Sequence, residues 1–283
     1  MKTPYHSGER AVQTKAGVTD MANRIGKSIR HVIPPEAQAF MAAQPMAVLG
    51  TIDRDGAVWA SLLTGEPGFL STVDPQTLRI DAGFLPGDPV LENLVVHPQI
   101  GTIVIEFATR RRMRLNGKAD IRTDGAIEIH ADQVYSNCQK YIQAREWQRP
   151  DPGPRSGREA RQHLSLTKQQ QQWIAAADTF FIASSHPTGG VDASHRGGPP
   201  GFVRILDEKR LTWPDYPGNT MFQTLGNIAE NPRAGLLFID FEQGGTLQLS
   251  GKVEILWDAE QTAELPSAER RIVFQIDRIV EIP

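Results

Sequence analysis

The chain has a single cysteine, Cys138, among its 283 residues. One cysteine excludes an internal disulfide and a zinc site built from several thiolates, and it is typical of a reducing compartment. Long apolar runs are also missing, since none approaches the roughly 20 residues that a helix needs to cross a bilayer. The N-terminal residues lack the apolar core of a secretory signal. We therefore expect a cytoplasmic protein with no membrane partner.

An excess of charge of one sign is absent as well. The sequence has 30 Lys and Arg against 33 Asp and Glu, which gives a formal net charge of −3. Because there is no global basic excess, we expect no nucleic-acid partner, and any basic patch must be local. The hydrophobic content of 40% and the length are sufficient for two globular domains of ordinary size.

Glycine, in contrast, is concentrated between residues 186 and 205. The pairs Gly189–Gly190 and Gly197–Gly198 lie between apolar runs, which predicts strands joined by tight turns. Glycine allows positive φ and lets a ligand approach the main chain closely. Free N–H groups beside Arg196 would suit an anion such as phosphate. The alternative is a glycine-rich hairpin with a solvated basic tip.

Short apolar segments bounded by glycine, proline and Asp-Gly turns predict many antiparallel strands. We expect them at 47–52, 58–63, 69–70, 78–80, 100–107, 110–115 and 118–121. Helices are expected at 36–43 and 165–177, and residues 128–147 are expected to become helical towards their end.

A stretch rich in Pro, Gly and Arg, residues 148–158, predicts a domain boundary. We expect N-terminal helices and a first barrel in residues 1–147, a linker at 148–162 and a second barrel in 163–283.

The second half repeats the first. Gly65–Phe69 aligns with Gly198–Phe202, 133 residues later, and Gly117 aligns with Gly251, 134 residues later. A near-constant offset over about seventy residues indicates two copies of one β-barrel unit. A unit that pairs as a two-fold dimer can be fused into a pseudo-dimer, with ligand sites at the interface between the copies.

Several long strings in the second half carry a family resemblance. They are Ser194–Val203, Gly218–Asn219, Leu225–Asp240 and Thr246–Gly251. They resemble flavin-nucleotide-binding proteins related to pyridoxamine 5′-phosphate oxidase. The first half, through Trp59–Gly65 and Thr109–Gly117, is similar to the companion domain of the two-barrel members. The resemblance implies a mainly β fold with peripheral helices, two tandem split β-barrels forming a pseudo-dimer, and bound FMN.

The resemblance also implies which residues hold the cofactor. The arginine-bearing strand would supply Asp192, Ser194, His195 and Arg196, and the next strand and turn would supply Thr212, Trp213, Asn219 and Thr220. The strand that meets the flavin ring would supply Thr246 and Gln248, or Arg112 and Arg114. Asn219–Thr220 stands where the oxidase has a basic pair, and residues 270–278 do not match its substrate residues. Pyridoxamine phosphate is therefore not the expected substrate.

The two halves differ at these positions. Ser194–Arg196 aligns with Ser61–Leu63, and we align Asn219–Thr220 with Asp88–Pro89. An aspartate would repel phosphate, and proline removes a backbone donor. We predict that only the second repeat keeps a phosphate pocket, which gives one flavin per chain.

Three further groups have two interpretations each. Arg110, Arg112 and Arg114 share one strand face and either reach an anion across the interface or form a solvated face. His195 either donates a proton near a reduced flavin or only forms hydrogen bonds. Cys138 is expected to be a half-buried structural residue. His186 has no metal-type partners at suitable spacing, and no metal site is expected.

The leading functional hypothesis is an FMN-dependent oxidoreductase that acts on a small molecule or a nicotinamide nucleotide. The alternatives are a flavin-binding or storage module without turnover, and a haem- or deazaflavin-binding relative on the same barrel. A homodimer of chains is possible in each case.

Overall fold

The computed structural model describes residues 3–147, 159–257 and 268–283. The first repeat has seven strands: β1 (Met46–Ile52), β2 (Val58–Thr64), β3 (Leu70–Asp74), β4 (Thr77–Ile80), β5 (Gln99–Glu106), β6 (Arg111–Ile121) and β7 (Ile127–Ser136). The second has β8 (Arg161–His163), β9 (Thr179–His186), β10 (Gly190–Gly197), β11 (Arg204–Asp207), β12 (Arg210–Asp215), β13 (Arg233–Ile239), β14 (Thr246–Leu256) and β15 (Arg270–Ile282).

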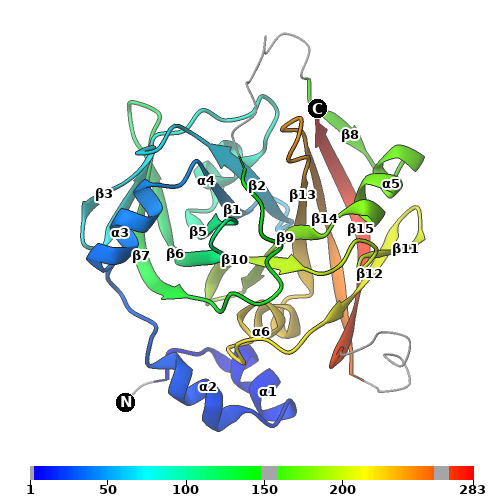
Figure 1. The fold of residues 1–283 in the computed structure, drawn as a ribbon, viewed down its shortest axis with the longest axis horizontal. Coiled ribbons are helices and arrows are strands. Elements are labelled where there is room, and N and C mark those ends of the chain that lie inside the picture. Colours follow the sequence, from blue (N-terminus) through cyan, green and yellow to red (C-terminus); the bar gives the residue numbers. More distant parts are fainter. Residues whose placement is uncertain (1–2, 148–158, 258–267) are drawn as a thin grey trace.

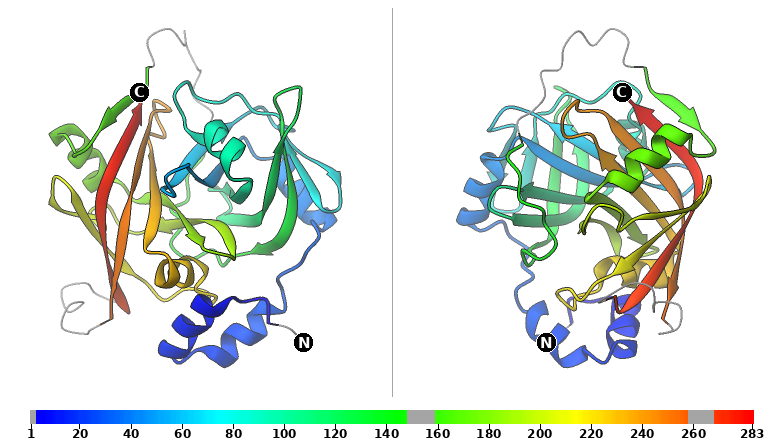
Figure 2. Two further views of the ribbon diagram at one scale, coloured as in Figure 1. Left: turned by 180° about the vertical axis from the view of Figure 1, so that it is seen from behind. Right: turned by 45° about the vertical axis from the view of Figure 1, so that its right-hand side comes forward.

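The helices lie around these sheets (Figure 1). They are α1 (Ser7–Lys15), α2 (Thr19–Gly26), α3 (Pro35–Ala42), α4 (Val90–Val96), α5 (Lys168–Ala176) and α6 (Gln223–Glu230). Figure 2 shows α1 and α2 together at one end of the molecule, next to α6. Because α4 precedes β5 and α6 precedes β13, these two helices are counterparts in the two repeats.

The strands form two antiparallel sheets that share one topology over seven strands, and in the second sheet β8 pairs additionally with β15. The order in the first is β2-β1-β5-β6-β7-β4-β3, and the order in the second is β10-β9-β13-β14-β15-β12-β11. The registers agree as well, since Gly101 pairs with Gly50 and Asn116, while Gly235 pairs with Ala183 and Ser250. The expected fold class, two tandem split β-barrels in a mainly β chain, is therefore confirmed.

The repeats meet through a pair of equivalent glycines. A Cβ on Gly101 would lie 2.5 Å from Asp192 Cα, and a Cβ on Gly235 would lie 2.7 Å from Trp59 Cα. Only glycine allows the backbones to approach this closely. A buried apolar cluster that includes Val48, Phe181 and other residues of both repeats fills the space beside them. The two barrels thus pack as a pseudo-dimer with a continuous core.

Most of the expected elements are present, with two exceptions. The strands expected at 110–115 and 118–121 form one continuous strand, β6, because Asn116–Gly117 is a bulge within the strand and not a turn. The helix expected towards the end of 128–147 is wrong, because β7 occupies Ile127–Ser136 and the described residues that follow are not helical. Ile127, Ile129 and Ala131 are buried and alternate with more exposed residues, which is the period of a strand. Residues 148–158 of the expected linker lie outside the described part, and Arg161 and Gln162 belong to β8.

Within the described residues, no helix is both long enough and apolar enough to span a membrane. The same part of the chain contains no group of three or more His, Cys, Asp or Glu side chains placed to hold a metal ion.

Candidate functional site

A cavity of about 400 Å³ lies between the repeats, which is within the usual range for ligand pockets of about 300–1,000 Å³. The first repeat contributes β6 and residues 137–141 to its wall. The second repeat contributes β10, the loop 214–222, the start of α6 and Arg270 of β15. The segment after α1 closes one side through Lys15, Ala16 and Val18.

Four buried or half-buried arginines surround this cavity. Two of them are neutralised by carboxylates, because Arg114 forms an ion pair with Asp192, and Arg270 Nε lies 2.7 Å from Asp215 Oδ2. The other two, Arg112 and Arg196, form no ion pair with a carboxylate in the described part of the chain. The cavity wall therefore carries positive charge that its own acids do not neutralise.

Arg112 and Arg196 instead contact neutral acceptors. Arg112 donates to Cys138 O at 2.7 Å and lies 3.1 Å from His195 Nδ1, while Arg196 donates to His195 O at 3.1 Å. Burial lowers the pKa of Arg112 to about 10, with Arg114 and Arg196 acting in the same direction. Burial also lowers the pKa of Arg196. With a pKa of about 10, the Arg112 guanidinium is charged near neutral pH, so an anion in the cavity would be stabilised.

The N-terminus of α6 faces the same space. Its N-cap residue, Phe222, has φ of 60°, and in the described structure no side chain caps this end of the helix. Free N–H groups and the helix dipole favour an anion at such a position. Tyr141, Thr220 and Phe222 are three of the four described non-glycine residues with positive φ, and all three line the cavity. Such backbone conformations are costly and cluster at functional sites.

Behind the cavity wall, Asp192 connects the two repeats. It accepts hydrogen bonds from Tyr135 Oη at 3.1 Å and from Thr224 Oγ1 at 3.3 Å, in addition to the ion pair with Arg114. Thr224 Oγ1 also lies 3.1 Å from Ser194 Oγ. Asp192 therefore fixes Arg114 of β6 against the first turn of α6.

His195 is buried in the wall, with the edges of two phenylalanine rings near its own ring. Burial lowers its pKa well below the ordinary value, and the nearby Arg112 and Arg196 lower it further. The ring is therefore neutral. Its Nδ1 can only accept the hydrogen bond from Arg112, which places the proton on Nε2. His195 can donate a hydrogen bond, but it does not hold a positive charge at neutral pH.

Several buried polar atoms of the cavity have no partner within the described residues. Apart from atoms of the ion-paired Arg114, they are Arg112 Nε, Asn137 Oδ1, His195 Nε2 and Gln223 Nε2. Unpaired buried polar atoms are rare and need an explanation such as a ligand or water. They include three donors and one acceptor, which fits a polar, anionic ligand.

A sequence model of the pyridoxamine 5′-phosphate oxidase family matches residues 33–157 and 166–277, one match for each repeat. The chain belongs to the pyridoxamine 5′-phosphate oxidase family. A curated relative, the rifampicin phosphotransferase of Bacillus subtilis strain 168, is 27% identical over 230 residues. The match covers 76% of this chain and 26% of that protein, so the chain spans about a quarter of the relative's length.

Solved structures similar to this family member each cover less than half of it. An FMN-binding protein from Syntrophomonas wolfei has 9% identity and a TM-score of 0.31, and the match covers 41% of this chain and 85% of that one. A FAD-binding protein from Mesorhizobium loti has 13% identity, a TM-score of 0.29, and coverage of 43% and 96%. General stress protein 26 from Bacillus anthracis has 11% identity, a TM-score of 0.31, and coverage of 41% and 92%.

The residues that the family resemblance proposed for the cofactor divide into three groups. Seven of them line the cavity: Arg112, Arg114, Ser194, His195, Arg196, Asn219 and Thr220. Asp192 lies directly behind, in contact with Arg114. Four do not line it: Thr212, Trp213, Thr246 and Gln248. Thr212 is buried and donates to Ile272 O, and Trp213 packs in the core of the second repeat.

Two other expectations for this family member need correction. Cys138 is exposed rather than half-buried, because it follows the end of β7 and lies at the cavity wall. Arg110 has φ of 57° and lies in the turn before β6, so it does not share the strand face of Arg112 and Arg114. Sequence reasoning also missed Asn137 and Gln223. The signal for Gln223 is its place as the first, polar residue of the helix that follows Phe222.

The first repeat of this family member has a counterpart of the site at the start of α4. Equivalent registers place Ser61 at the position of Ser194 and Gln248 at the position of Arg114. Between them lies the half-buried Asp88, which accepts from Ser61 Oγ at 2.7 Å, Gln248 Nε2 at 2.6 Å and the Val90 N–H at 2.9 Å. Burial raises the pKa of Asp88, while these hydrogen bonds lower it.

The position of Asp88 also corrects the alignment of the two repeats. Asn93 of α4 donates to Thr51 Oγ1, and Asn227 of α6 donates to Ser184 Oγ at the equivalent register position, so the two helices align with an offset of 134 residues. Asp88 therefore corresponds to Phe222, and the expected alignment of Asp88–Pro89 with Asn219–Thr220 is wrong by three residues.

Proposed function

We propose that the chain binds one FMN non-covalently in the cavity between the repeats and acts as an oxidoreductase. The observation that carries the proposal is that Arg112 and Arg196, two guanidinium groups without carboxylate partners in the described chain, line the same cavity as the uncapped start of α6. A monoanion or dianion such as a phosphate monoester fits this arrangement. The four unpaired polar atoms fit the remaining polar groups of FMN.

The first repeat suggests where the phosphate would be held. In that repeat the carboxylate of Asp88 lies between a serine, the residue equivalent to Arg114, and the first N–H of the helix. By this equivalence, Ser194, Arg114 and the first N–H groups of α6 would hold the phosphate, and Arg196, two residues after Ser194 on β10, would contribute a second guanidinium. Asn219 and Thr220 would close the loop over it.

The rest of the wall would orient the flavin ring. Arg112 is two residues from Arg114 on β6, which separates their Cα atoms by about 7 Å along the strand. Arg112 Nε and Asn137 Oδ1 offer a donor and an acceptor in this region, as a ring edge with C=O and N–H groups requires. FMN, when bound, supplies the hydride or electron transfer. Neutral His195 would hold a proton on Nε2 and donate a hydrogen bond.

For the electron donor and acceptor we propose only a chemical class, a nicotinamide nucleotide or another small molecule. In this scheme the phosphate-binding domain is 163–283, to which the first repeat contributes Arg112 and Arg114. A flavin-binding module without turnover uses the same residues and differs only in its reactivity.

The decisive experiment identifies the cofactor. The purified protein, reconstituted with FMN where necessary, should release FMN on denaturation, as checked by absorbance and mass spectrometry. Haem or a deazaflavin in the released fraction would refute the assignment. Anaerobic bleaching of the flavin by a nicotinamide nucleotide supports the oxidoreductase. If no donor reduces the bound flavin, the module without turnover is supported.

A substitution tests the position of the phosphate. Arg196→Ala should weaken FMN binding by about tenfold to a hundredfold, because a hydrogen bond to a charged group contributes about 1.5–3 kcal/mol. The control is Arg210→Ala, since Arg210 is exposed, does not line the cavity, and pairs with Asp207 across the turn between β11 and β12. Fluorescence quenching of FMN gives both affinities. Equal affinities for the two variants would contradict the proposed phosphate site.

A further inference from the structure

We propose that α1 positions the ligand-binding loop, residues 219–222, so that the N-terminal segment controls affinity at the cavity without contributing the principal ligand contacts. The affinity part of this inference rests on the proposed function. The effect on the loop itself does not, because it can be measured without a ligand.

The contact between α1 and α6 depends on two glycines. A Cβ on Gly8 would lie 2.3 Å from Gly226 O, and a Cβ on Gly226 would lie 2.5 Å from Glu9 Cα. The two helices therefore approach each other to backbone contact, which any larger side chain at either position would prevent. This fixes α1 at the helix whose first turn lines the cavity.

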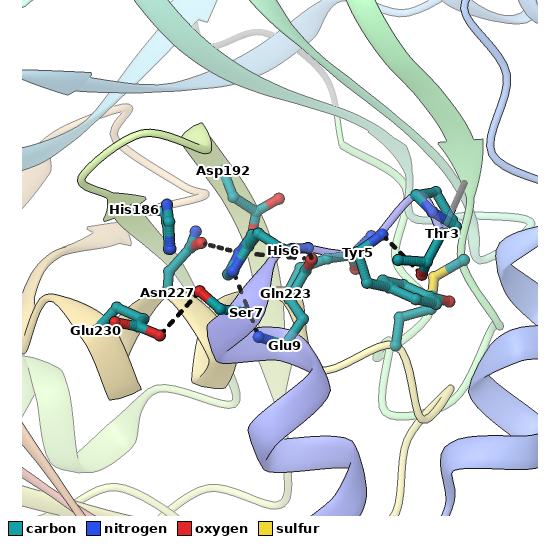
Figure 3. A network of polar contacts seen from close by, with 12 residues as sticks. Thr3, Tyr5, His6, Ser7, Glu9, His186, Asp192, Gln223, Asn227 and Glu230 are labelled. Atoms are coloured by element: carbon teal, nitrogen blue, oxygen red, sulfur yellow. Dashed lines mark hydrogen bonds and ion pairs between the residues drawn. The ribbon is translucent and has the colours of Figure 1, made fainter.

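The start of α1 is held in place by polar contacts, as Figure 3 shows. His6 caps the helix in a capping box with Glu9, and His6 Nε2 lies 2.9 Å from Asn227 Oδ1 of α6. Ser7 Oγ donates to Glu230 Oε1 at 3.0 Å. The orientation of α1 on α6 is thus fixed at several points along both helices.

One side chain of α1 reaches the loop directly. Gln13 is 1% exposed, and its Nε2 donates to Met221 O at 2.9 Å. Met221 is flanked by Thr220 and Phe222, whose φ angles of 62° and 60° lie in the left-handed region. Such conformations persist only where the surroundings enforce them. Gln13 supplies this support from outside the loop and from the other end of the sequence.

The same segment continues to the cavity, where Lys15, Ala16 and Val18 form part of the wall. Docked α1 thus favours the loop conformation that receives the ligand. Since coupling between two equilibria is reciprocal, a ligand in the cavity must favour the docking of α1 to the same extent.

The test uses the full chain and two isosteric variants. Gln13→Met keeps the volume of the side chain but removes the donor to Met221 O. Gln44→Met is the matched control, because Gln44 is also buried and its amide donates to Phe40 O in the first repeat. Thermal unfolding shows that each variant folds. Hydrogen exchange of peptides covering 219–226 is measured without ligand, and FMN affinity is measured by fluorescence quenching.

We expect Gln13→Met to speed hydrogen exchange in 219–226 by about fivefold to tenfold and to weaken FMN binding by the same factor. Gln44→Met should change neither quantity. A second variant, Gly8→Ala, should act in the same direction as Gln13→Met. Exchange in 219–226 that is equal in Gln13→Met and the control would overturn the inference. If the wild-type chain binds no FMN, the proposed function fails, and the exchange measurement alone decides whether α1 positions the loop.

Discussion

The starts of α4 and α6 are equivalent places that two copies of one unit use differently. At α4 the chain supplies its own anion, because Asp88 accepts from Ser61, Gln248 and the Val90 N–H. At α6 the equivalent space is a cavity with arginines in its wall. One repeat thus satisfies its helix start internally, and the other leaves it for a ligand.

The comparison explains how a duplicated chain can have a single site. In a symmetric dimer, a substitution that closes one site closes both. After fusion, Asp88 and Gln248 can close one site while Arg114 and Arg196 keep the other. The closed site still contributes to stability, since its half-buried carboxylate has three hydrogen-bond donors.

The two helices also differ in what covers them. Gly226 of α6 allows the contact with α1, whereas the equivalent residue on α4 is Glu92. Val95 of α4 is 76% exposed. Among the described residues, α6 has a second helix packed in backbone contact upon it and α4 does not, which links the N-terminal segment to the open site.

The largest effect is expected from making the open site resemble the closed one. Arg114→Gln gives the open site the residue type that the closed site has at the equivalent position, Gln248. It removes a buried guanidinium from the phosphate position, and we expect FMN affinity to fall by about a hundredfold. Gln248→Ala is the control and should leave the affinity unchanged. Similar losses in both variants, measured by fluorescence quenching, would show that the two sites are not functionally distinct.

The packing of α1 on α6 predicts that the free energy of unfolding depends on pH. Burial raises the pKa of Glu9 to about 7 from an ordinary 4.5. Below about pH 4.5 both states are protonated, and between about 4.5 and 7 the unfolded chain loses its proton first, so the free energy of unfolding falls as the pH rises. Glu9→Gln removes this fall. The free energy of unfolding of Glu9→Gln minus that of the wild type should therefore be more positive at about pH 8 than at about pH 4, by on the order of 2 kcal/mol.

Urea unfolding at the two pH values checks this prediction. The control is Glu230→Gln, because the Glu230 side chain is exposed and pairs with Ser7 on the same pair of helices. A pH-independent difference for Glu9→Gln would mean that its carboxyl group is not held in the protonated form by burial.

Much of this comparison could be predicted from the sequence. Constant offsets between glycine motifs gave the repeat, and glycine motifs are informative because Gly101 and Gly235 lie where backbones touch. The meeting of Arg112 with Ser194 and Arg196 followed from treating the repeats as a fused dimer. These inferences depend on local patterns and on symmetry, which the sequence carries directly.

The rest depends on contacts between distant segments. No local pattern indicates that Gln13 donates to Met221 O, 208 residues away. The alternation of Ile127, Ile129 and Ala131 was visible, but the residues after it were expected to be helical. The expected alignment of Asp88 departed from the offset of 134 residues that relates α4 to α6, because the sequence alone does not show where each helix starts.

A smaller effect is expected at the closed site. Asp88→Asn keeps one acceptor but turns an amide N–H₂ towards a group that also donates, so a buried hydrogen bond is lost. We expect the free energy of unfolding to fall by about 1–2 kcal/mol in urea titrations, with FMN affinity unchanged. A change in FMN affinity without a loss of stability would indicate that the ligand uses this site too.

The smallest effect is a change in the reactivity of Cys138, which distinguishes the two sites without altering either. This residue is the only cysteine of the sequence, is exposed, and lines the cavity at α6. A bound ligand should restrict access to its thiol and slow alkylation by iodoacetamide by about threefold, since the rate depends on exposure as well as on thiolate character. Mass spectrometry gives the rate with and without FMN. In Arg196→Ala the same protection should require about tenfold more FMN. An alkylation rate that does not change at saturating FMN would place the ligand away from this cavity, and protection that does not depend on Arg196 would separate the ligand from the proposed phosphate position.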